Sequence, residues 1–448
     1  MMRANLHRQR GAVAIMVAIA LLLLLSVVGL VLDAGLGYMV KARLNAAVDS
    51  AAVAAARAVT NGNDKAAQER SAQTAAAEFF AANIPDGYLL SHPKLLSTNV
   101  QFNGGTVTID VRAEAPMKVS LMGVLGFTDM TPTASAQTIR RDLDMVFVVD
   151  DSGSLWTMGQ EVRAAAKSFL NKFNVTQDRV GLVHFGSGAE VDNPINTSAR
   201  GFDRMSMFSK IDGYTFGGTT SAVEGMWHAR DQLKKIPDNA RSSLRVIVFF
   251  SDGVPNGFGA YFPFYYPSGC PYPGVITWQP DHARPTGLYW LNESTANPIG
   301  GGCEVISQNY WAIKNLPDWY NAHNPQSKPN DPAGLEFRIV TDKPRSVTSS
   351  LTQVNVGRAA RNLAEAVAEK AREEGTYVFT LGMGSELKKT VDGEIGENVL
   401  KCMANVADGP ARCYNPNKPV GMYCYAATEA DLTPCFSRLA SAILRISK

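Results

Sequence analysis

Hydrophobic and polar positions give the 448-residue chain three parts with different periodicities. The first is residues 12–32, a run of 21 predominantly apolar residues without a charged side chain. At about 1.5 Å per helical residue such a run spans roughly 30 Å, the thickness of a bilayer core. The apolar region of a cleaved signal peptide is usually only about 7–15 residues long. We therefore predict a transmembrane helix over 12–32.

Residues 1–11, which precede this span, contain Arg3, His7, Arg8 and Arg10 and no acidic residue. By the positive-inside rule, a basic flank stays in the cytoplasm. We therefore expect a cytoplasmic basic segment at 1–11. The chain should be a single-pass inner (cytoplasmic) membrane protein whose bulk is periplasmic or extracellular.

The second part, residues 33–140, combines alanine-rich stretches with one strand pattern. Residues 38–59 and 71–83 are rich in alanine and free of proline, which favours helix. These helices form either a solvated stalk or a surface that packs lengthwise against identical helices, because small side chains allow close approach. The second of these alternatives predicts homo- or hetero-oligomers that form through the N-terminal helix.

A small β-containing module follows within this second part. Val107, Ile109 and Val111 alternate with polar residues, which is typical of a half-buried strand, and Asn103-Gly104-Gly105 just before them indicates a hairpin. We also expect extended segments at 121–127 and 132–139. The module by itself indicates no chemistry.

The third part, residues 141–448, alternates short apolar runs with segments of helical periodicity. The expected strands are 145–149, 180–185, 244–250 and 376–381, and the expected helices are 162–173, 222–233, 356–371 and 432–446. Continuous apolar strands are typical of a sheet that is buried on both faces. We predict an α/β fold with a mainly parallel sheet and helices on both faces.

A segment at about 255–350, rich in Pro, Gly, Tyr and Trp, interrupts this alternation. Insertions of this length are usually functional or mobile. It contains Cys270 and Cys303, and we expect these two to form a disulfide, since an extracytoplasmic location is oxidising. Three pairings stay open for the other four cysteines: Cys402, Cys413, Cys424 and Cys435.

Three polar loops adjoin the predicted core elements: residues 150–154, 217–220 and 251–253. Because ligands of such sheets bind at the carboxyl ends of the strands, we expect the loops to meet. Taken singly, each loop also fits a turn or a helix cap. Together they supply carboxylate and hydroxyl oxygens, which suit Mg²⁺, Mn²⁺ or Ca²⁺ and not zinc or copper. An ion with so few charged ligands would accept a carboxylate from a partner.

The pattern of these loops resembles the metal-ion-dependent adhesion site of von Willebrand factor A domains. The resemblance covers residues 141–448, and it implies the Rossmann-like fold of that family. It also implies five metal-site residues: Asp150, Ser152, Ser154, Thr219 and Asp252. The three hydroxyls would then bind the ion directly, with the aspartates acting partly through water.

The N-terminal part is similar to the TadE/TadG-like segment of tight-adherence (Flp) pilus proteins. The similarity is carried by the residues R-Q-R-G-A-V-A-I, the leucine run, L-D-A-G and the following alanine-rich helix. It implies a pilus-assembly or adhesion protein, minor pseudopilin-like, with other pilus or secretion components as partners. Incorporation in a pilus, or display at the cell surface, is then expected. The alternative is a membrane-anchored A-domain scaffold or regulator of a secretion or ATPase complex without a pilus role.

Other function classes lack the residues that they need. Net charge is +2, so composition does not indicate a nucleic-acid partner. The dehalogenase-type phosphatase motif needs a second carboxylate where Ser152 stands, the chain has no G-x-S-x-G, and its six histidines form no H-E-x-x-H pair. We interpret His184 as a core or strand-end residue, and we expect no catalytic residue and no enzyme activity.

Overall fold

The computed structural model describes residues 10–59, 65–103, 106–264, 270, 272–278, 285–294, 297–300, 303, 313–324 and 335–446. Most of the expected basic segment 1–11, the glycines of the expected hairpin and parts of the 255–350 segment lie outside the described residues. The chain separates into two compact units, residues 1–140 and residues 141–448.

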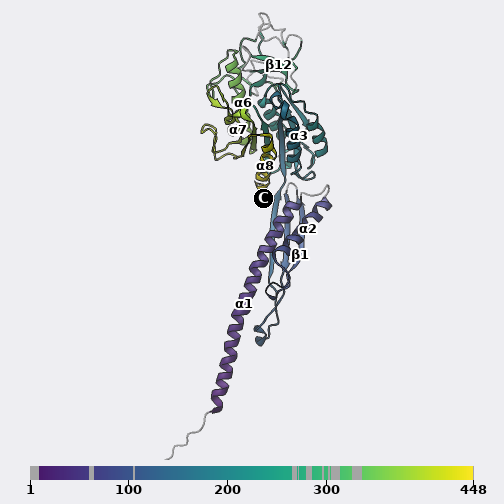
Figure 1. Ribbon diagram of the computed structural model, residues 1–448, viewed down its shortest axis with the longest axis vertical. Coiled ribbons are helices and arrows are strands. Elements are labelled where there is room, and N and C mark those ends of the chain that lie inside the picture. Colours follow the sequence, from purple (N-terminus) through teal and green to yellow (C-terminus); the bar gives the residue numbers. More distant parts are fainter. Residues whose placement is uncertain are drawn as a thin grey trace, which may run out of the picture. The chain divides into compact units, whose positions relative to one another are not determined.

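The first unit contains two helices and a three-stranded sheet. Helix α1 (Arg10–Ala58) is followed by α2 (Lys65–Asn83) and a 3₁₀ turn, η1 (Tyr88–Leu90). The sheet has the order β1 (Lys94–Asn103), β2 (Thr106–Glu114), β5 (Thr133–Arg141). In Figure 1, α2 and β1 lie alongside the C-terminal half of α1, which is drawn in purple.

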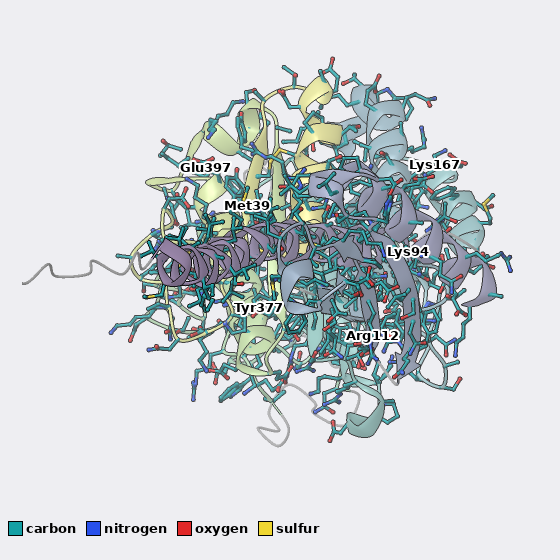
Figure 2. All side chains as sticks on the ribbon, turned by 90° about the horizontal axis from the view of Figure 1, so that it is seen from below. Met39, Lys94, Arg112, Lys167, Tyr377 and Glu397 are labelled. Atoms are coloured by element: carbon teal, nitrogen blue, oxygen red, sulfur yellow. A yellow bond between two sulfur atoms is a disulfide. The ribbon has the colours of Figure 1, made fainter. Side chains whose placement is uncertain are left out.

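The two halves of α1 differ in burial. Val40, Leu44 and Val48 of its C-terminal half are fully buried in a core that also contains Val107 and Ile109 of β2. This confirms the predicted helix over 38–59 and the predicted alternation, because a strand that covers a helix buries every second residue. Met39 of the same half, labelled in Figure 2, is half exposed. The N-terminal half exposes its apolar side chains and is long and apolar enough to cross a membrane.

A short hairpin of the first unit differs from the sequence prediction. It consists of β3 (Met117–Lys118), a 3₁₀ helix η2 (Met122–Leu125) and β4 (Asp129–Met130). The predicted extended segment over 121–127 is therefore wrong. The residues turn into η2 because their backbone N–H groups bind a side chain of α1, a partner that is distant in sequence. The predicted extended segment over 132–139 is confirmed as β5.

The second unit is built on a six-stranded sheet. Its order is β16 (Tyr423–Ala426), β13 (Tyr377–Met383), β9 (Leu244–Ser251), β6 (Leu143–Asp150), β7 (Arg179–Phe185), β8 (Ala189–Asn193). All neighbouring strands are parallel except β7 and β8. The four predicted core strands are thus confirmed, and β6 lies at the centre of the sheet between β7 and β9.

Helices cover both faces of this sheet. One face packs against α3 (Gly159–Leu170), α4 (Arg204–Asp212) and α8 (Leu432–Ile446), and the other against α5 (Ala222–Lys234), α6 (Gln353–Glu373) and α7 (Glu397–Ala404). Phe147 of β6 contributes to the first core and Val148 to the second. Every position of β6 is therefore buried, which explains its unbroken apolar sequence. Figure 2 labels Lys167 on α3 and Tyr377 and Glu397 at the starts of β13 and α7.

The described part of the 255–350 segment forms its own small antiparallel sheet. Strands β10 (Gly257–Ala260), β11 (Gly274–Thr277) and β12 (Thr286–Trp290) follow one another in it. Phe258 and Val275 are buried in the same core as α5 and α6, so the segment packs on the helices of one face. The remaining short elements are η3 (Gly153–Met158), η4 (Asp238–Ala240), η5 (Ser385–Lys388), β14 (Thr390–Val391), β15 (Glu394–Ile395) and η6 (Glu429–Asp431).

All six cysteines form disulfides within the second unit. Cys270 is bonded to Cys303, which confirms the predicted pair. The pairing that the sequence left open is Cys402–Cys413 and Cys424–Cys435. The last two bonds each join cysteines that are 11 residues apart in sequence, so they crosslink short segments near the C-terminus.

Candidate metal centre

The first loop of the candidate site begins at Asp150, the last residue of β6. Its Oδ1 accepts the backbone N–H of Ser152 at 2.8 Å, a local turn that aspartate favours because its side chain mimics a backbone carbonyl. The chain then enters η3, so that Ser152 and Ser154 follow the strand end in a compact turn. The Oγ atoms of these two serines lie 3.3 Å apart. Asp150 itself is completely buried.

The third loop comes from the neighbouring strand β9 and is joined to the first by side-chain hydrogen bonds. The hydroxyl of Ser251, the last residue of β9, donates to Oδ2 of Asp150. The hydroxyl of Ser154 donates to Oδ1 of Asp252 at 2.8 Å. Asp252 is only 3% exposed. The parallel pairing of β6 and β9 brings these loops together, although about a hundred residues separate them in sequence.

The second loop, residues 217–220, closes the site from the side of α5. Its Gly218 has a φ of 77°, a left-handed conformation that suits glycine, and an added Cβ there would lie 2.4 Å from the hydroxyl of Ser187. The carbonyl of Gly218 accepts the N–H of Gly153 at 3.2 Å, which ties this loop to the first. Thr219 follows, and its buried Oγ1 has no hydrogen-bond partner among the described residues.

The structure thus places all five predicted residues at one edge of the sheet. Ser152, Ser154, Thr219 and Asp252 line one cavity of about 740 Å³, and the buried Asp150 accepts the backbone N–H of Ser152. The cavity is also lined by Trp278, from the 255–350 segment, and by residues of α6. The long insertion therefore forms one wall of the cavity.

The carboxylates of the site are held in an environment that disfavours their charge. Burial raises the pKa of Asp150 to about 6, against the effect of its hydrogen bonds. Burial and repulsion by Asp150 raise the pKa of Asp252 to about 8. In the part of the chain that the structure describes, neither carboxylate has a Lys, Arg or His ion-pair partner. Buried carboxylates without a cationic partner are costly unless a proton or a cation neutralises them.

The donor atoms determine which cation would fit. No group of three or more His, Cys, Asp or Glu side chains that could hold a metal occurs among the described residues. The site instead offers two carboxylates and three hydroxyls, and all of its donor atoms are oxygens. Buried polar atoms are normally hydrogen-bonded or bound to an ion. Among the described residues the Thr219 hydroxyl has no hydrogen-bond partner, so its oxygen is available to bind a cation. The residues therefore fit Mg²⁺, Mn²⁺ or Ca²⁺.

A second polar cluster lies next to the site and was not predicted from the sequence. His184 contacts Asp192 through Nδ1 at 2.8 Å and Ser294 through Nε2 at 3.0 Å, and the hydroxyl of Ser294 donates to Oδ2 of Asp151 at 3.1 Å. Burial opposes the charge of His184, but the hydrogen bond to Asp192 and the nearby Asp151 raise its pKa overall. Burial also raises the pKa of Asp151, to about 7.

This cluster resembles a Ser-His-Asp triad only in composition. In a hydrolase the serine hydroxyl donates to histidine, which acts as a base. Here the hydroxyl of Ser294 donates to Asp151, and Ser294 is only 6% exposed. The interpretation of His184 as a strand-end residue therefore fits its position. It lies near the end of β7, and its Nε2 is 3.8 Å from Oδ2 of Asp151.

Two family models match the chain in separate regions. Residues 144–263 match the von Willebrand factor type A domain, and residues 11–58 match the putative Flp pilus-assembly TadE/G-like family. No curated protein sequence matches the chain. The first match covers β6 and both of its neighbours in the sheet, as well as all three loops of the site. The second coincides with α1.

Several solved structures of pilus proteins are similar at low identity. The pilus adhesin SpaC from Lactobacillus rhamnosus GG is 13% identical, with 80% of this chain and 34% of SpaC covered and a TM-score of 0.39. The PilB minor pilin from Streptococcus sanguinis is 14% identical, with 80% and 79% covered and a TM-score of 0.39. The vWF domain of the type V pili tip protein Mfa5 from Porphyromonas gingivalis is 17% identical, with 69% and 98% covered and a TM-score of 0.38.

The chain spans about one third of the length of SpaC. These structural likenesses are distant, so the assignment depends on the two family models and on the sheet described above. The order of the matches along the chain is that of the predicted architecture, an apolar N-terminal helix followed by an A domain. The chain is therefore similar to TadG-like proteins: a segment that matches the TadE/G-like family at residues 11–58 precedes a von Willebrand factor type A domain at residues 144–263.

Proposed function

We propose that this protein is a membrane-anchored, extracytoplasmic pilus-assembly or adhesion protein that binds a protein partner through a divalent cation. Asp150, Ser152, Ser154, Thr219 and Asp252 would hold the cation, which is Mg²⁺, Mn²⁺ or Ca²⁺. When bound, the ion supplies an open coordination position for a carboxylate oxygen of the partner. The role is binding and not catalysis.

One observation carries this proposal: among the described residues, a buried hydroxyl without a hydrogen-bond partner lies in the same cavity as a buried carboxylate without an ion-pair partner. Thr219 Oγ1 has no hydrogen-bond partner among the described residues, and Asp252 shares its cavity. A site whose donors satisfied one another would leave no such atom. An oxygen-binding cation would use the free hydroxyl and neutralise the buried carboxylates in one step.

The cavity beside these residues supports binding of a partner's side chain. Trp278 and Arg361 line it together with the hydroxyl-bearing loops. Arg361 also bonds to Asp392 at 2.9 Å, and its Nε is buried without a hydrogen-bond partner among the described residues. The lining also contains Lys389 and the acidic Glu386 and Asp392, so the bound cation itself would attract a carboxylate of the partner protein, and Trp278 would supply an apolar surface beside it.

The metal part of the proposal is tested by titrating the full-length protein, in detergent micelles, with Mg²⁺, Mn²⁺ and Ca²⁺ by calorimetry. Thr219→Val removes one hydroxyl and keeps the shape. It should weaken binding at least about tenfold, because even outer-shell partners of a metal contribute 10–100-fold. Asp150→Ala should abolish binding over the same concentration range.

Thr220→Val is the matched control, because Thr220 neighbours Thr219 and is equally buried, with 6% of its surface exposed. It should bind the ion as the wild type does. Equal affinities of the Thr219 and Thr220 variants would contradict the proposed ligand set.

The biological part is tested by Asp150→Ala in cells that produce the pilus. Loss of pilus assembly or of surface adhesion, with normal amounts of the protein in the membrane, supports the adhesion role. Unchanged pili and adhesion, together with co-purification of a cytoplasmic ATPase, would favour the alternative of a scaffold or regulator without a pilus role.

A further inference from the structure

The hairpin between β3 and β4 has an uncharged tip. Residues 119–128, hereafter the 119–128 tip, have the sequence V-S-L-M-G-V-L-G-F-T and contain no ionisable side chain. Lys118 and Asp129, which flank the tip and pair across the hairpin, form an ion pair at 2.6 Å. Phe127, within the tip, is 54% exposed. The hairpin therefore has a charged base and an apolar end.

Asp33 of α1 attaches this tip to the helix. Its carboxylate accepts three backbone N–H groups of the tip, from Ser120 at 3.0 Å, Leu121 at 2.9 Å and Met122 at 2.7 Å. These bonds cap the start of η2, whose first N–H groups have no partner within so short a helix. Asp33 is only 2% exposed as a result.

Two glycines of α1 allow the hairpin to approach the helix closely. A Cβ at Gly29 would lie 2.6 Å from Cβ of Leu121, and a Cβ at Gly37 would lie 2.4 Å from the sulfur of Met130. The contact therefore extends over about two turns of α1, from Gly29 to Gly37. Its position along the helix is defined by packing on both sides of Asp33.

The position of this contact relates the tip to the apolar span. Gly29 lies three residues inside the predicted span 12–32. At 1.5 Å per residue, Leu121 therefore contacts α1 about 4–5 Å inside the C-terminal end of the span. Apolar groups of proteins that lie in a membrane interface are buried about 5–10 Å deep. The exposed apolar side chains of α1, such as Leu23 at 64% and Leu32 at 52%, form the adjoining surface.

We propose that the 119–128 tip is a second lipid contact, which enters the outer boundary of the bilayer beside α1. The inference rests on the proposed membrane anchoring of α1. Lipid is the occupant because the tip continues the exposed apolar surface of the span, and Lys118 at its base is placed to meet lipid headgroups. The contact would fix the height and rotation of the first unit at the membrane, which a single helix leaves free.

The test uses full-length protein in vesicles of phosphatidylethanolamine and phosphatidylglycerol that contain an alkyne-tagged lipid. The photoreactive residue benzoylphenylalanine replaces Phe127, Phe79 or Leu23, one at a time. Phe79 of α2 is the matched control, since it is an aromatic residue of the same unit with 50% exposure. Lipid labelling at Phe127 should be several-fold above that at Phe79 and similar to that at Leu23.

A second variant tests the attachment. Asp33→Asn should reduce lipid labelling at Phe127 and leave labelling at Leu23 unchanged, because it weakens the cap of η2 without changing the span. Labelling at Leu23 together with only background labelling at Phe127 would overturn the tip contact and leave the anchor intact. No labelling at either position would overturn the anchor as well. Crosslinks from Phe127 to a second copy of the chain would assign the tip to a protein interface instead.

Discussion

Two buried aspartate sites in this chain use the same functional group for opposite purposes. In the first unit, Asp33 accepts three backbone N–H groups, so its lone pairs are used within the fold. In the second unit, Asp150 and Asp252 repel each other, and a free hydroxyl lies nearby. A carboxylate whose two oxygens both accept backbone hydrogen bonds attaches one element to another. Carboxylates without an ion-pair partner would instead form a site for a cation, as proposed above.

The difference follows from the partners that each location provides. The turn into η2 offers peptide N–H groups, and the Asp33 carboxylate accepts three of them, from Ser120, Leu121 and Met122. The loops after β6 and β9 offer hydroxyls and a second carboxylate, since parallel strands bring their carboxyl ends to one edge. Hydroxyls can donate to a carboxylate or bind a cation through oxygen, so under the proposed function the second site would respond to metal.

The largest expected effect concerns pH. Without metal, the free energy of unfolding of the second unit should fall by several kcal/mol from about pH 4 to about pH 8. The pKa values of Asp150, Asp151 and Asp252 are raised from 3.8 to about 6, 7 and 8. The folded chain therefore holds protons in this window that the unfolded chain has released, so a rise in pH favours unfolding.

Urea denaturation followed by tryptophan fluorescence measures this effect, because all six tryptophans lie beyond residue 141. His184, whose pKa is also raised, adds a loss of the same sign near neutral pH. Saturating Mg²⁺ should flatten most of the profile, since the cation replaces the protons on Asp150 and Asp252. A flat profile in metal-free buffer would show that these carboxylates are not destabilised by burial.

The next effect separates the binding role of a carboxylate from a role in stability. Asp252→Asn should weaken binding of Mg²⁺ by on the order of 100-fold, the upper range for groups around a metal. The metal-free second unit should be as stable as the wild type or more stable, because the substitution removes a buried charge and its repulsion with Asp150. Calorimetric titration and urea denaturation without metal measure the two quantities. If the variant is less stable than the wild type without metal, the Asp252 carboxylate stabilises the fold through its hydrogen bonds, as that of Asp33 does.

The smallest expected effect is the converse change in the first unit. Asp33→Asn should accelerate amide hydrogen exchange of Ser120, Leu121 and Met122 on the order of tenfold, because a neutral acceptor binds the N–H groups more weakly. Mg²⁺ affinity should stay unchanged. Exchange mass spectrometry of the full-length protein measures the first quantity and calorimetric titration the second. Unchanged exchange at these three amides would mean that the carboxylate does not hold the hairpin.

Much of the fold could be predicted from local patterns alone. The apolar runs of β6 and β9, the alternation of β2 and the helical periodicity of α3, α5, α6 and α8 all reflect which faces are buried, and burial repeats with the period of the element. The same patterns placed the candidate ligands Asp150 and Asp252 directly after their strands. The pair Cys270–Cys303 could be expected because both cysteines lie in one inserted segment.

The errors and omissions share one feature, which is dependence on a distant partner. The hairpin tip was expected to be extended, but Asp33, nearly ninety residues away, caps it as η2. The hydrogen bond of Ser251 to Asp150 and the link between His184 and Ser294 join residues about a hundred positions apart. Buried Glu224 likewise joins α5 to Tyr320 and His323 of the inserted segment. No local pattern records such contacts.

The sequence by itself therefore determined the elements, the order of the two units and the chemical type of the candidate ligands, because these depend on side chains that are close along the chain. The tertiary structure alone decided which oxygens are already hydrogen-bonded and which are left over. At Asp33 three distant backbone N–H groups bind the two carboxylate oxygens, whereas the buried hydroxyl of Thr219 has no hydrogen-bond partner among the described residues. That difference depends on the hydrogen-bond geometry of residues far apart in sequence, which only the folded chain brings within about 3 Å of each other.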